Sequence, residues 1–571
     1  MIQAGDQIVR DTIVEANICI VGGGPAGITL AMELAKTGRS ILLLESGGLR
    51  PSDETQKLNF GEVADEALHS PPDKYRQRCF GGGTSIWGGR CVPFDPIDFA
   101  VRPWIEHSGW PIGYEEVRQH YPAANKLCEA GEFEYDARLA VNGGMRPLLR
   151  GFSPRHFDMN GIERFSCPTD FGKRYGPRLD AATNIRVLHD STVTHLRASL
   201  DGGRIESLRV LSNRGRNFSV IADQFVLAMG GIETPRLLLT SDDIHSGGIG
   251  NVHDLVGRFY MCHIAGTIGS LQVDGPADTV WHGYDVAADG TYCRRRISLR
   301  SEVQADRHLA NVVFRLHHPR ITDPGHRTGP LSAIFLAQNF ISYEYAKRLV
   351  SDQRPTSTTW LRHGYNAAVD PLSTVSFLAH WFRDRILAER KFPSIIIRPK
   401  TNRFSLDFHA EQAPNPSSRI GLASSTDRFG NRQVRVDWRY CRQDVETVET
   451  SFGLLCGDLR EQSVGRLTLA ADERDIETVV RRDGAYGGHH IGTTRMGDSP
   501  SRGVVDSNGK VFGVNNLYIA GSSVFPTSSQ ANPTLTIVAM ALRLANHLRH
   551  IQAQVPHITT VRQSAMESQN G

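Results

Sequence analysis

Two adjacent histidines, His489 and His490, stand in the segment GGHHIGTTRMG (487–497). A neutral imidazole can accept a proton at pH 7, so either residue could act as a general base. A shared metal ion is the alternative, but neighbouring side chains of an extended segment point to opposite faces. No HExxH motif and no nearby cysteine or carboxylate cluster supplies further ligands. The sequence therefore favours acid–base chemistry and predicts no metal site.

A second segment with chemical meaning lies near the start of the chain, where GGGPAG follows the apolar run ANICIV (16–21). Gly22, Gly24 and Gly27 have the spacing that makes a tight turn and lets backbone approach a pyrophosphate at a helix N-terminus. The helical pattern ITLAMELAKTGRS follows, and Glu45 ends the next expected strand, SILLLESGG (40–48). An acidic residue at this distance suits a ribose diol. The unit predicts a dinucleotide site for either FAD or NAD.

Two later segments favour FAD. RCFGGGTSIWGGR (78–90) is a further glycine-rich run that would let backbone approach a large flat ring, and ADQFVLAMGGIETPRLLLTS (222–241) returns the chain to the nucleotide sheet. A nicotinamide cofactor usually needs one compact domain, whereas a flavin domain is often assembled from distant chain segments.

The remaining patterns predict the elements around these segments. Strands are expected within 184–199, 204–213 and 217–231, with a strand and loop in 515–526 and an amphipathic helix over 533–551. Alternation in 403–412 and 432–440 predicts an antiparallel sheet. Helices are expected over 331–350 and 372–391; we expect their aromatic residues to pack on the sheet or cover a pocket, and an interfacial membrane contact is the alternative.

Composition excludes several classes. The 571 residues carry 64 basic and 61 acidic side chains, a net charge of +3, with no basic stripe of the kind that binds nucleic acid. The nine cysteines are scattered and form no CxxC pair, which is typical of reduced thiols. No basic start with an apolar core marks a signal peptide, and no apolar run reaches 18 residues, so no transmembrane segment is predicted. We expect a cytoplasmic protein.

Six blocks together resemble the glucose–methanol–choline (GMC) oxidoreductase family and keep its order along the chain. They are GGGPAG with Glu45, GGGTSIWGG (81–89), AMGGIETPRLLL (228–239), NVHDLVGRFYMCH (251–263), HHIGTTRMG (489–497) and NNLYIAGSSVFPTSSQANPTLT (515–536). Within the family, SGWPIGYEEVRQHYPAA (108–124), EQAPNPSSRIGL (411–422) and the TSIW quartet look most like the pyranose and glycoside oxidases and sugar dehydrogenases.

The resemblance implies an α/β fold with a Rossmann-like FAD-binding domain and a substrate domain of mostly antiparallel sheet and helices, as in the p-hydroxybenzoate hydroxylase-like architecture. The expected FAD-binding domain is discontinuous and comprises 1–110, 175–262 and 481–551. The expected substrate-binding domain comprises 111–174 and 263–480, and a polar tail occupies 552–571.

The family pattern H-x-x-G-T-x-R-M-G selects His489 as the catalytic base and Asn532 as its partner, and leaves His490 as a packed support. The resemblance implies FAD contacts at Gly22, Gly24, Gly27, Glu45, Gly83, Thr84, Trp87, Gly88, Val193, Gly521, Ser522, Asn532, Pro533 and Thr534. Relatives that tether the flavin do so through a histidine at the position of Ile86, which has no nucleophilic atom, and neither His69 nor Cys79 matches that position. Non-covalent FAD is therefore expected.

Other polar residues of these blocks have less definite roles. We interpret His263 as a buried structural histidine, Arg495 as an anchor of its loop and Met496 as a core residue. Glu411 and Gln412 could contact substrate hydroxyls or could equally cap or pair within the sheet.

The implied function is oxidation of a secondary alcohol of a sugar or glycoside to a ketone. Hydride would pass to flavin N5, His489 would take the hydroxyl proton, and O2 or a quinone-type acceptor would reoxidise the flavin. Two alternatives remain: a GMC dehydrogenase or oxidase for a non-sugar alcohol in a biosynthetic pathway, and a lyase in which FAD is structural. A non-catalytic flavoprotein is disfavoured by the His489–Asn532 pair.

Overall fold

The computed structural model describes residues 1–340, 355–394, 396–397, 399, 401–470, 475–484 and 488–553. The expected polar tail from residue 554 onward, and residues 341–350 of the helix expected at 331–350, lie outside these ranges.

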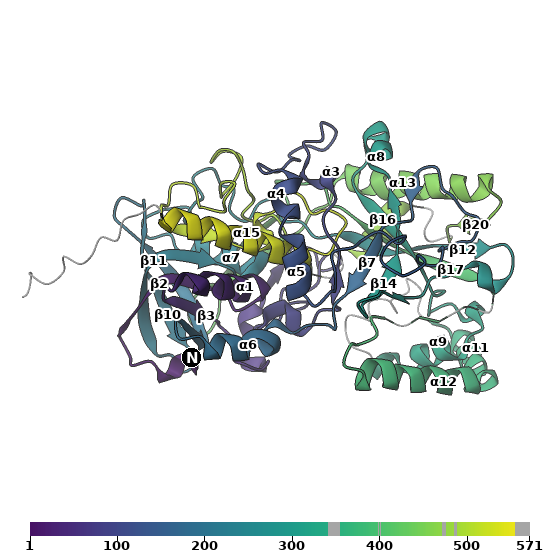
Figure 1. Ribbon diagram of the computed structural model, residues 1–571, viewed down its shortest axis with the longest axis horizontal. Helices are drawn as coiled ribbons and strands as arrows, with labels where there is room; N and C mark the ends of the chain where they lie inside the picture. The colour runs from purple at the N-terminus through teal and green to yellow at the C-terminus, as the bar shows by residue number, and fades with distance from the viewer. Residues whose placement is uncertain are drawn as a thin grey trace, which may run out of the picture.

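An eight-stranded sheet forms one half of the molecule, on the left in Figure 1, in the order β1-β8-β3-β2-β11-β10-β9 with β21 also paired to β11. Its inner strands β8, β3, β2, β11 and β21 are parallel. The apolar runs predicted as strands are buried here, because a parallel sheet is covered on both of its faces. The strands are β1 (Ile2–Ala4), β2 (Ile13–Val21), β3 (Ile41–Leu44), β8 (Ile185–His189), β9 (Ser191–Ala198), β10 (Ile205–Ser212), β11 (Asn217–Leu227) and β21 (Leu517–Ile519).

Helix α1 (Pro25–Leu34) links β2 to β3 and packs against α15 (Thr534–Ala553) and α6 (Phe171–Ala181). It begins at Pro25, whose fixed φ and missing N–H suit the first helical position. The helix therefore starts four residues after β2 ends, inside the glycine turn, and not at Ile28 where the apolar pattern begins.

A six-stranded, largely antiparallel sheet forms the other half, in the order β20-β12-β17-β16-β15-β6, with α13 (Arg442–Glu461) packed on it (Figure 1). Its strands are β6 (Phe157–Asp158), β12 (Ile264–Val273), β15 (Ile297–Leu299), β16 (Val312–His317), β17 (Arg403–Ala410) and β20 (Gly465–Thr468). Because successive side chains of β17 alternate, Phe404, Leu406 and Phe408 join the hydrophobic core. Asp407 and His409 lie on the opposite face, toward a cavity.

Two smaller sheets connect the halves: β13-β14-β7-β5 and β18-β19-β4. Strands β4 (Gly61–Val63) and β5 (Arg90–Cys91) pair with β19 (Arg432–Asp437) and β7 (Ile162–Phe165). The other strands are β13 (Asp285–Val286), β14 (Tyr292–Arg295) and β18 (Arg419–Thr426). Strands of the two large sheets fall within the respective ranges expected from sequence. Strands β4 and β5, however, lie in the range expected for the FAD-binding domain and pair with strands in the range expected for the substrate-binding domain. The boundaries themselves remain a prediction.

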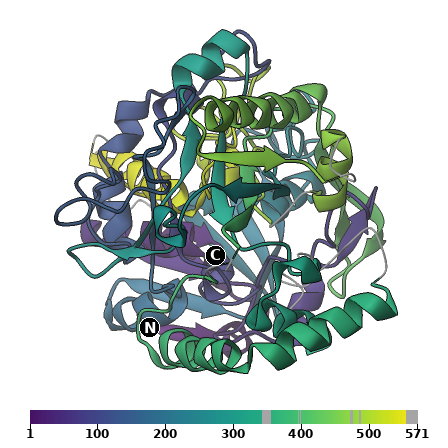
Figure 2. The ribbon, with the colours of Figure 1, turned by 90° about the vertical axis from the view of Figure 1, so that its right-hand side faces the viewer.

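A layer of helices lies apart from both large sheets, along the lower edge in Figure 2: α9 (Gly329–Leu336), α11 (Ser357–Val369) and α12 (Pro371–Trp381). Leu331 and Phe335 are buried against Trp360 and Phe377 in a small separate cluster. The helices thus pack on one another, whereas Phe382 is 54% exposed. The pattern predicted α12 but missed α11. No described helix is both long enough and apolar enough to cross a membrane.

Candidate active site

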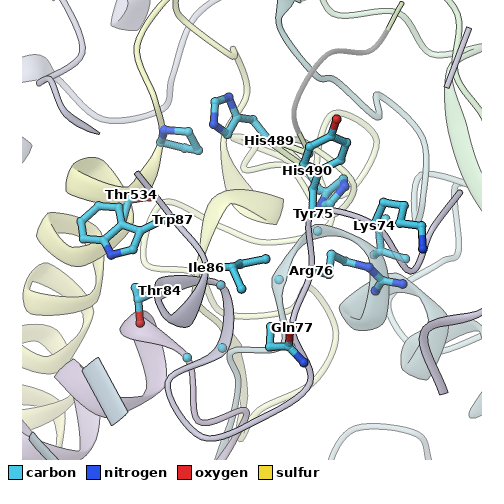
Figure 3. Close-up of a pocket in the computed structure, with 18 of the residues that line it drawn as sticks. Lys74, Tyr75, Arg76, Gln77, Thr84, Ile86, Trp87, His489, His490 and Thr534 are labelled. Carbon is cyan, nitrogen blue, oxygen red and sulfur yellow. The ribbon is translucent and has the colours of Figure 1, made fainter. Parts of the chain in front are cut away.

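One cavity of about 970 Å³ is lined by residues from the segments that the sequence patterns indicated as functional. Of the predicted cofactor contacts, all except Gly27 line it, as do His489 and Asn532. Figure 3 shows Thr84, Trp87, Thr534 and His489 around this space, with the segment Lys74–Gln77 on the facing side. No sequence pattern predicted that Lys74–Gln77, with its two basic residues, would line the cavity.

The glycine turn at one end of the cavity is built for close backbone approach. Gly22 has φ of +111°, and a Cβ on it would meet the Ala228 oxygen at 2.5 Å. A Cβ on Gly27 would lie 1.9 Å from the Gly22 oxygen, so Gly27 serves helix packing and not the cavity wall. Gly24 has no atom within 4 Å of its Cβ position, so its face is open at the N-terminus of α1. This cradle fits a pyrophosphate.

Glu45 lies beside this turn at the end of β3 and is 7% exposed. Its carboxylate accepts hydrogen bonds from the backbone N–H of Gly23 at 2.8 Å and of Gly47 at 2.7 Å. Burial raises its pKa, and these two backbone bonds oppose that rise. Each oxygen keeps a further lone pair, so the carboxylate can also accept a ribose diol. The cavity end therefore fits a dinucleotide.

The second glycine-rich segment forms the middle of the cavity. Trp87 is held by a hydrogen bond from Nε1 to the Thr169 oxygen at 2.9 Å, and the Thr84 hydroxyl donates to the Gly81 oxygen at 2.6 Å. Ile86 is 46% exposed to the cavity. His69 and Cys79 are buried and do not line the cavity.

The other end of the cavity holds His489 and its partners. Asn532 Nδ2 donates to His489 Nε2 at 3.1 Å, so Nε2 is the acceptor atom of the ring. Nδ1 then carries the proton and donates to His263 Nδ1 at 2.8 Å. His263 Nε2 in turn donates to the Ser528 oxygen at 3.2 Å. This chain of bonds fixes the tautomer that presents the Nε2 lone pair to the cavity.

His263 is fully buried, as a structural histidine would be, but its direct bond to His489 was not predicted. Burial, and secondarily the nearby Arg90 guanidinium, lower the pKa of His489 to about 4. The imidazole is therefore neutral at pH 7 and competent as a base.

His490 also lines the cavity, but its contacts differ from those of His489. Its ring stacks on Tyr260 with centroids 6.0 Å apart, and it lies next to Tyr75 in Figure 3. The His490 carbonyl accepts a hydrogen bond from the Ser522 hydroxyl at 2.7 Å. These contacts fit a packed support.

A third histidine stands next to the pair. His263, His409 and His489 bring ring nitrogens within 4.8 Å of one another, so two histidines that the sequence pattern did not indicate as ligands lie beside His489. Zinc bound at about 2.0–2.1 Å would need its nitrogens roughly 3.4 Å apart. All three Nδ1 atoms are used in hydrogen bonds, that of His409 to the Gln530 oxygen. Hydrogen bonding among neutral rings accounts for the cluster.

The face of the substrate sheet that borders the cavity is polar. Its polar residues that line the cavity are Thr267 on β12, Arg315 and His317 on β16, and Ser405, Asp407 and His409 on β17. None of these residues was predicted from sequence, although the alternation in RFSLDFHAEQ already separates Asp407 and His409 from the core residues.

Glu411 and Gln412, for which substrate contact and structural pairing were both open, are structural. Arg102 donates to both Glu411 oxygens at 2.5 and 2.6 Å, and both side chains are fully buried away from the cavity. The Gln412 side chain bonds Cys262 N and Trp438 Nε1.

Two further expectations about the histidine segment are supported by contacts. Arg495 donates to the His107 oxygen at 2.7 Å and lies over the Phe259 ring at 4.4 Å, which anchors the loop. Met496 is 2% exposed within the core.

Comparison with known proteins places this site in context. The family model described as GMC oxidoreductase matches residues 414–541, and one described as NAD(P)-binding Rossmann-like domain matches 20–52. Two solved structures cover 94% of this chain: pyridoxine 4-oxidase from Mesorbium loti (17% identity, 99% of that chain, TM-score 0.52) and an FAD-dependent oxidoreductase from Chaetomium thermophilum (16%, 100%, 0.54). These matches confirm the α/β class with a Rossmann-like domain.

Curated relatives match over most of their length at low identity. A 6'''-hydroxyparomomycin C oxidase from Streptomyces lividus is 24% identical over 93% of this chain and 92% of that protein. A 2-methyl-1,2-propanediol dehydrogenase from Mycolicibacterium austroafricanum is 22% identical, covering 94% and 95%. A C-glycoside 3-oxidase from Arthrobacter globiformis is 31% identical over 21% of this chain and 22% of that protein.

Proposed function

We propose that this chain, an FAD-dependent oxidoreductase of the GMC family that acts on alcohols, oxidises a secondary alcohol of a sugar or glycoside to a ketone. The observation that carries the proposal is the arrangement of one cavity, with the dinucleotide turn at one end and the His489–Asn532 pair at the other.

Bound FAD supplies the hydride acceptor, and O2, a quinone or another acceptor restores it. It would be held by the turn at Gly22 and Gly24, by Glu45 and by the segment from Gly83 to Gly88, without a covalent link. The lack of a nucleophilic atom at Ile86 supports the absence of a tether.

His489 is the base in this proposal. Its Nε2 lone pair receives the proton of the reacting hydroxyl while hydride leaves the adjacent carbon. Asn532 Nδ2, which donates to His489 Nε2 in the structure, can donate instead to the substrate oxygen and hold it without competing for its proton. Because His263 accepts from Nδ1, the ring is kept in the one tautomer that permits this step.

The polar wall supports a substrate with several hydroxyl groups. His409 donates through Nδ1 to the Gln530 oxygen, so its Nε2 is a hydrogen-bond acceptor. Asp407 and Thr267 add a carboxylate and a hydroxyl on the same sheet face. An alcohol with a purely apolar body would offer no donor to the His409 Nε2 acceptor, at a cost in binding.

Anaerobic mixing of the holoenzyme with glycosides, free sugars, 1,2-diols and simple alcohols tests the proposal. We expect glycosides or sugars to bleach the flavin's visible absorbance, and to do so with a higher specificity constant than the 1,2-diols and simple alcohols. Bleaching by non-sugar alcohols alone would favour the biosynthetic alternative. Turnover without bleaching would favour a lyase with structural FAD.

A further inference from the structure

The cavity wall beside His489 holds more positive than negative charge. Arg90, Arg294 and Arg315 surround one carboxylate, Glu163, which is fully buried on β7. Arg315 Nε donates to Glu163 Oε1 at 2.5 Å. Burial pushes the pKa of Glu163 up, but the Arg315 and Arg90 guanidiniums outweigh it and hold the pKa at about 2. One ionised carboxylate thus faces three guanidinium cations.

Of the three arginines, Arg90 has the fewest hydrogen-bond contacts with protein acceptors. Its Nε is 3.5 Å from Glu163 Oε2, and neither atom forms a hydrogen bond within the described part of the chain. The guanidinium lies over the Phe165 ring at 5.9 Å, and the side chain is 25% exposed on the cavity. An arginine has five N–H donors, and those of Arg90 have no acceptor among the described residues.

Neighbouring groups do not supply the missing anion. Asp407 lies opposite Arg315 in the strand register, but its carboxylate accepts from the Thr267 hydroxyl at 3.0 Å and lies 3.9 Å from His317 Nε2. Arg294 donates to the Leu316 oxygen. Among the described residues, the carboxylate nearest Arg90 is therefore Glu163, 3.5 Å from its Nε, and Arg90 shares that carboxylate with Arg315.

In a second arginine cluster that lines the same cavity, each guanidinium is paired with a carboxylate. Glu233 is paired with Arg76 at 2.9 Å, Arg78 at 3.0 Å and Arg236 at 3.3 Å, and Asp427 adds a second carboxylate to Arg236 at 2.7 Å. Two carboxylates there serve three guanidiniums at direct contact distances. Of these two clusters, the one beside His489 leaves a guanidinium, that of Arg90, at the cavity surface without a hydrogen bond to any described residue.

We propose that the substrate is an alcohol that also carries an oxyanion, a carboxylate or a phosphate, and that Arg90 binds this group. The planar guanidinium fork matches both anions and binds them through two parallel hydrogen bonds. The inference deepens the proposed function, on which it rests, by narrowing the substrate class to acidic sugars or glycosides. A cationic amino sugar would meet repulsion at the same place.

The test uses FAD-loaded His489→Ala protein under anaerobic conditions, in which turnover should be slowed by about 10²–10⁴-fold, so that binding is measured without interference from the reaction. Methyl β-glucuronide, glucose 6-phosphate and methyl β-glucoside are titrated, and binding is followed by calorimetry. We expect at least one charged probe to bind on the order of 10- to 100-fold more tightly than the glucoside, and high salt to weaken it. The tighter of the two charged probes identifies carboxylate or phosphate as the group recognised.

The double variant His489→Ala/Arg90→Gln should lose this preference, and Arg90→Lys should retain only part of it because lysine lacks the fork. Arg138→Gln is the matched control, since Arg138 is 70% exposed and does not line the cavity. Equal binding of charged and neutral probes, or a preference that survives Arg90→Gln, would overturn the inference. Because binding is read without turnover, the result stands apart from whether wild-type flavin is bleached by any alcohol.

Discussion

Replacing His489 by alanine should abolish rapid flavin reduction while FAD remains bound. The pKa of about 4 means that at pH 7 only about 0.1% of the imidazole is protonated, so the wild-type base is almost fully available. Its removal should therefore cost the whole general-base contribution, about 10²–10⁴-fold, or roughly 3–5 kcal/mol. FAD should stay bound because the turn and Glu45 lie at the other end of the cavity.

The assay is anaerobic stopped-flow bleaching of the flavin by the best glycoside, with bound FAD quantified by its absorbance. His490→Ala is the matched control: it loses the stacking on Tyr260, a contact worth at most about tenfold in rate. A larger loss in His490→Ala than in His489→Ala would refute the assignment of the base.

Three further outcomes are expected. Asn532→Ala should slow flavin reduction about 3- to 10-fold, the value of one neutral hydrogen bond; an unchanged rate would remove Asn532 from the site. Since a depressed histidine pKa keeps the neutral base present above it, reduction should be pH-independent near neutrality and fall only as pH drops toward about 4, whereas a limb near pH 6.5 would contradict the burial of His489. Acid precipitation of the wild type should release yellow FAD into the supernatant, and a yellow pellet would contradict non-covalent binding. Glu45→Ala should lose FAD on gel filtration, and a variant that keeps its full FAD content would contradict the role of Glu45 in holding the cofactor.

The parts of the fold that sequence predicted are those specified locally. The turn from Gly22 to Gly27 follows from backbone sterics and phosphate chemistry, which act within six residues. Buried strands such as β2 and β3 have continuous apolar runs, and α15 has an amphipathic period. Each of these elements can therefore be predicted from a short stretch of sequence. Helix α11 is less apolar overall, with Arg362, His363 and Asn366 among its residues, and its packing against α9 stabilises it.

The parts that sequence missed depend on residues far apart in the chain. Glu411 pairs with Arg102 across 309 positions, and His263 with His489 across 226. No spacing rule encodes such a contact, because tertiary packing alone brings the partners together. Asp407 and His409 differ: strand alternation exposes them on the non-core face, so a stricter use of that period would have found the polar wall.

The most direct test of the account is the structure of the product. Carbon-13 NMR of the product from the preferred glycoside should show one ring CHOH carbon replaced by a ketone carbon, with one substrate consumed per flavin reduced under anaerobic conditions. An aldehyde formed at a primary hydroxyl, or an elimination product formed with the flavin still oxidised, would contradict the proposed secondary-alcohol oxidation.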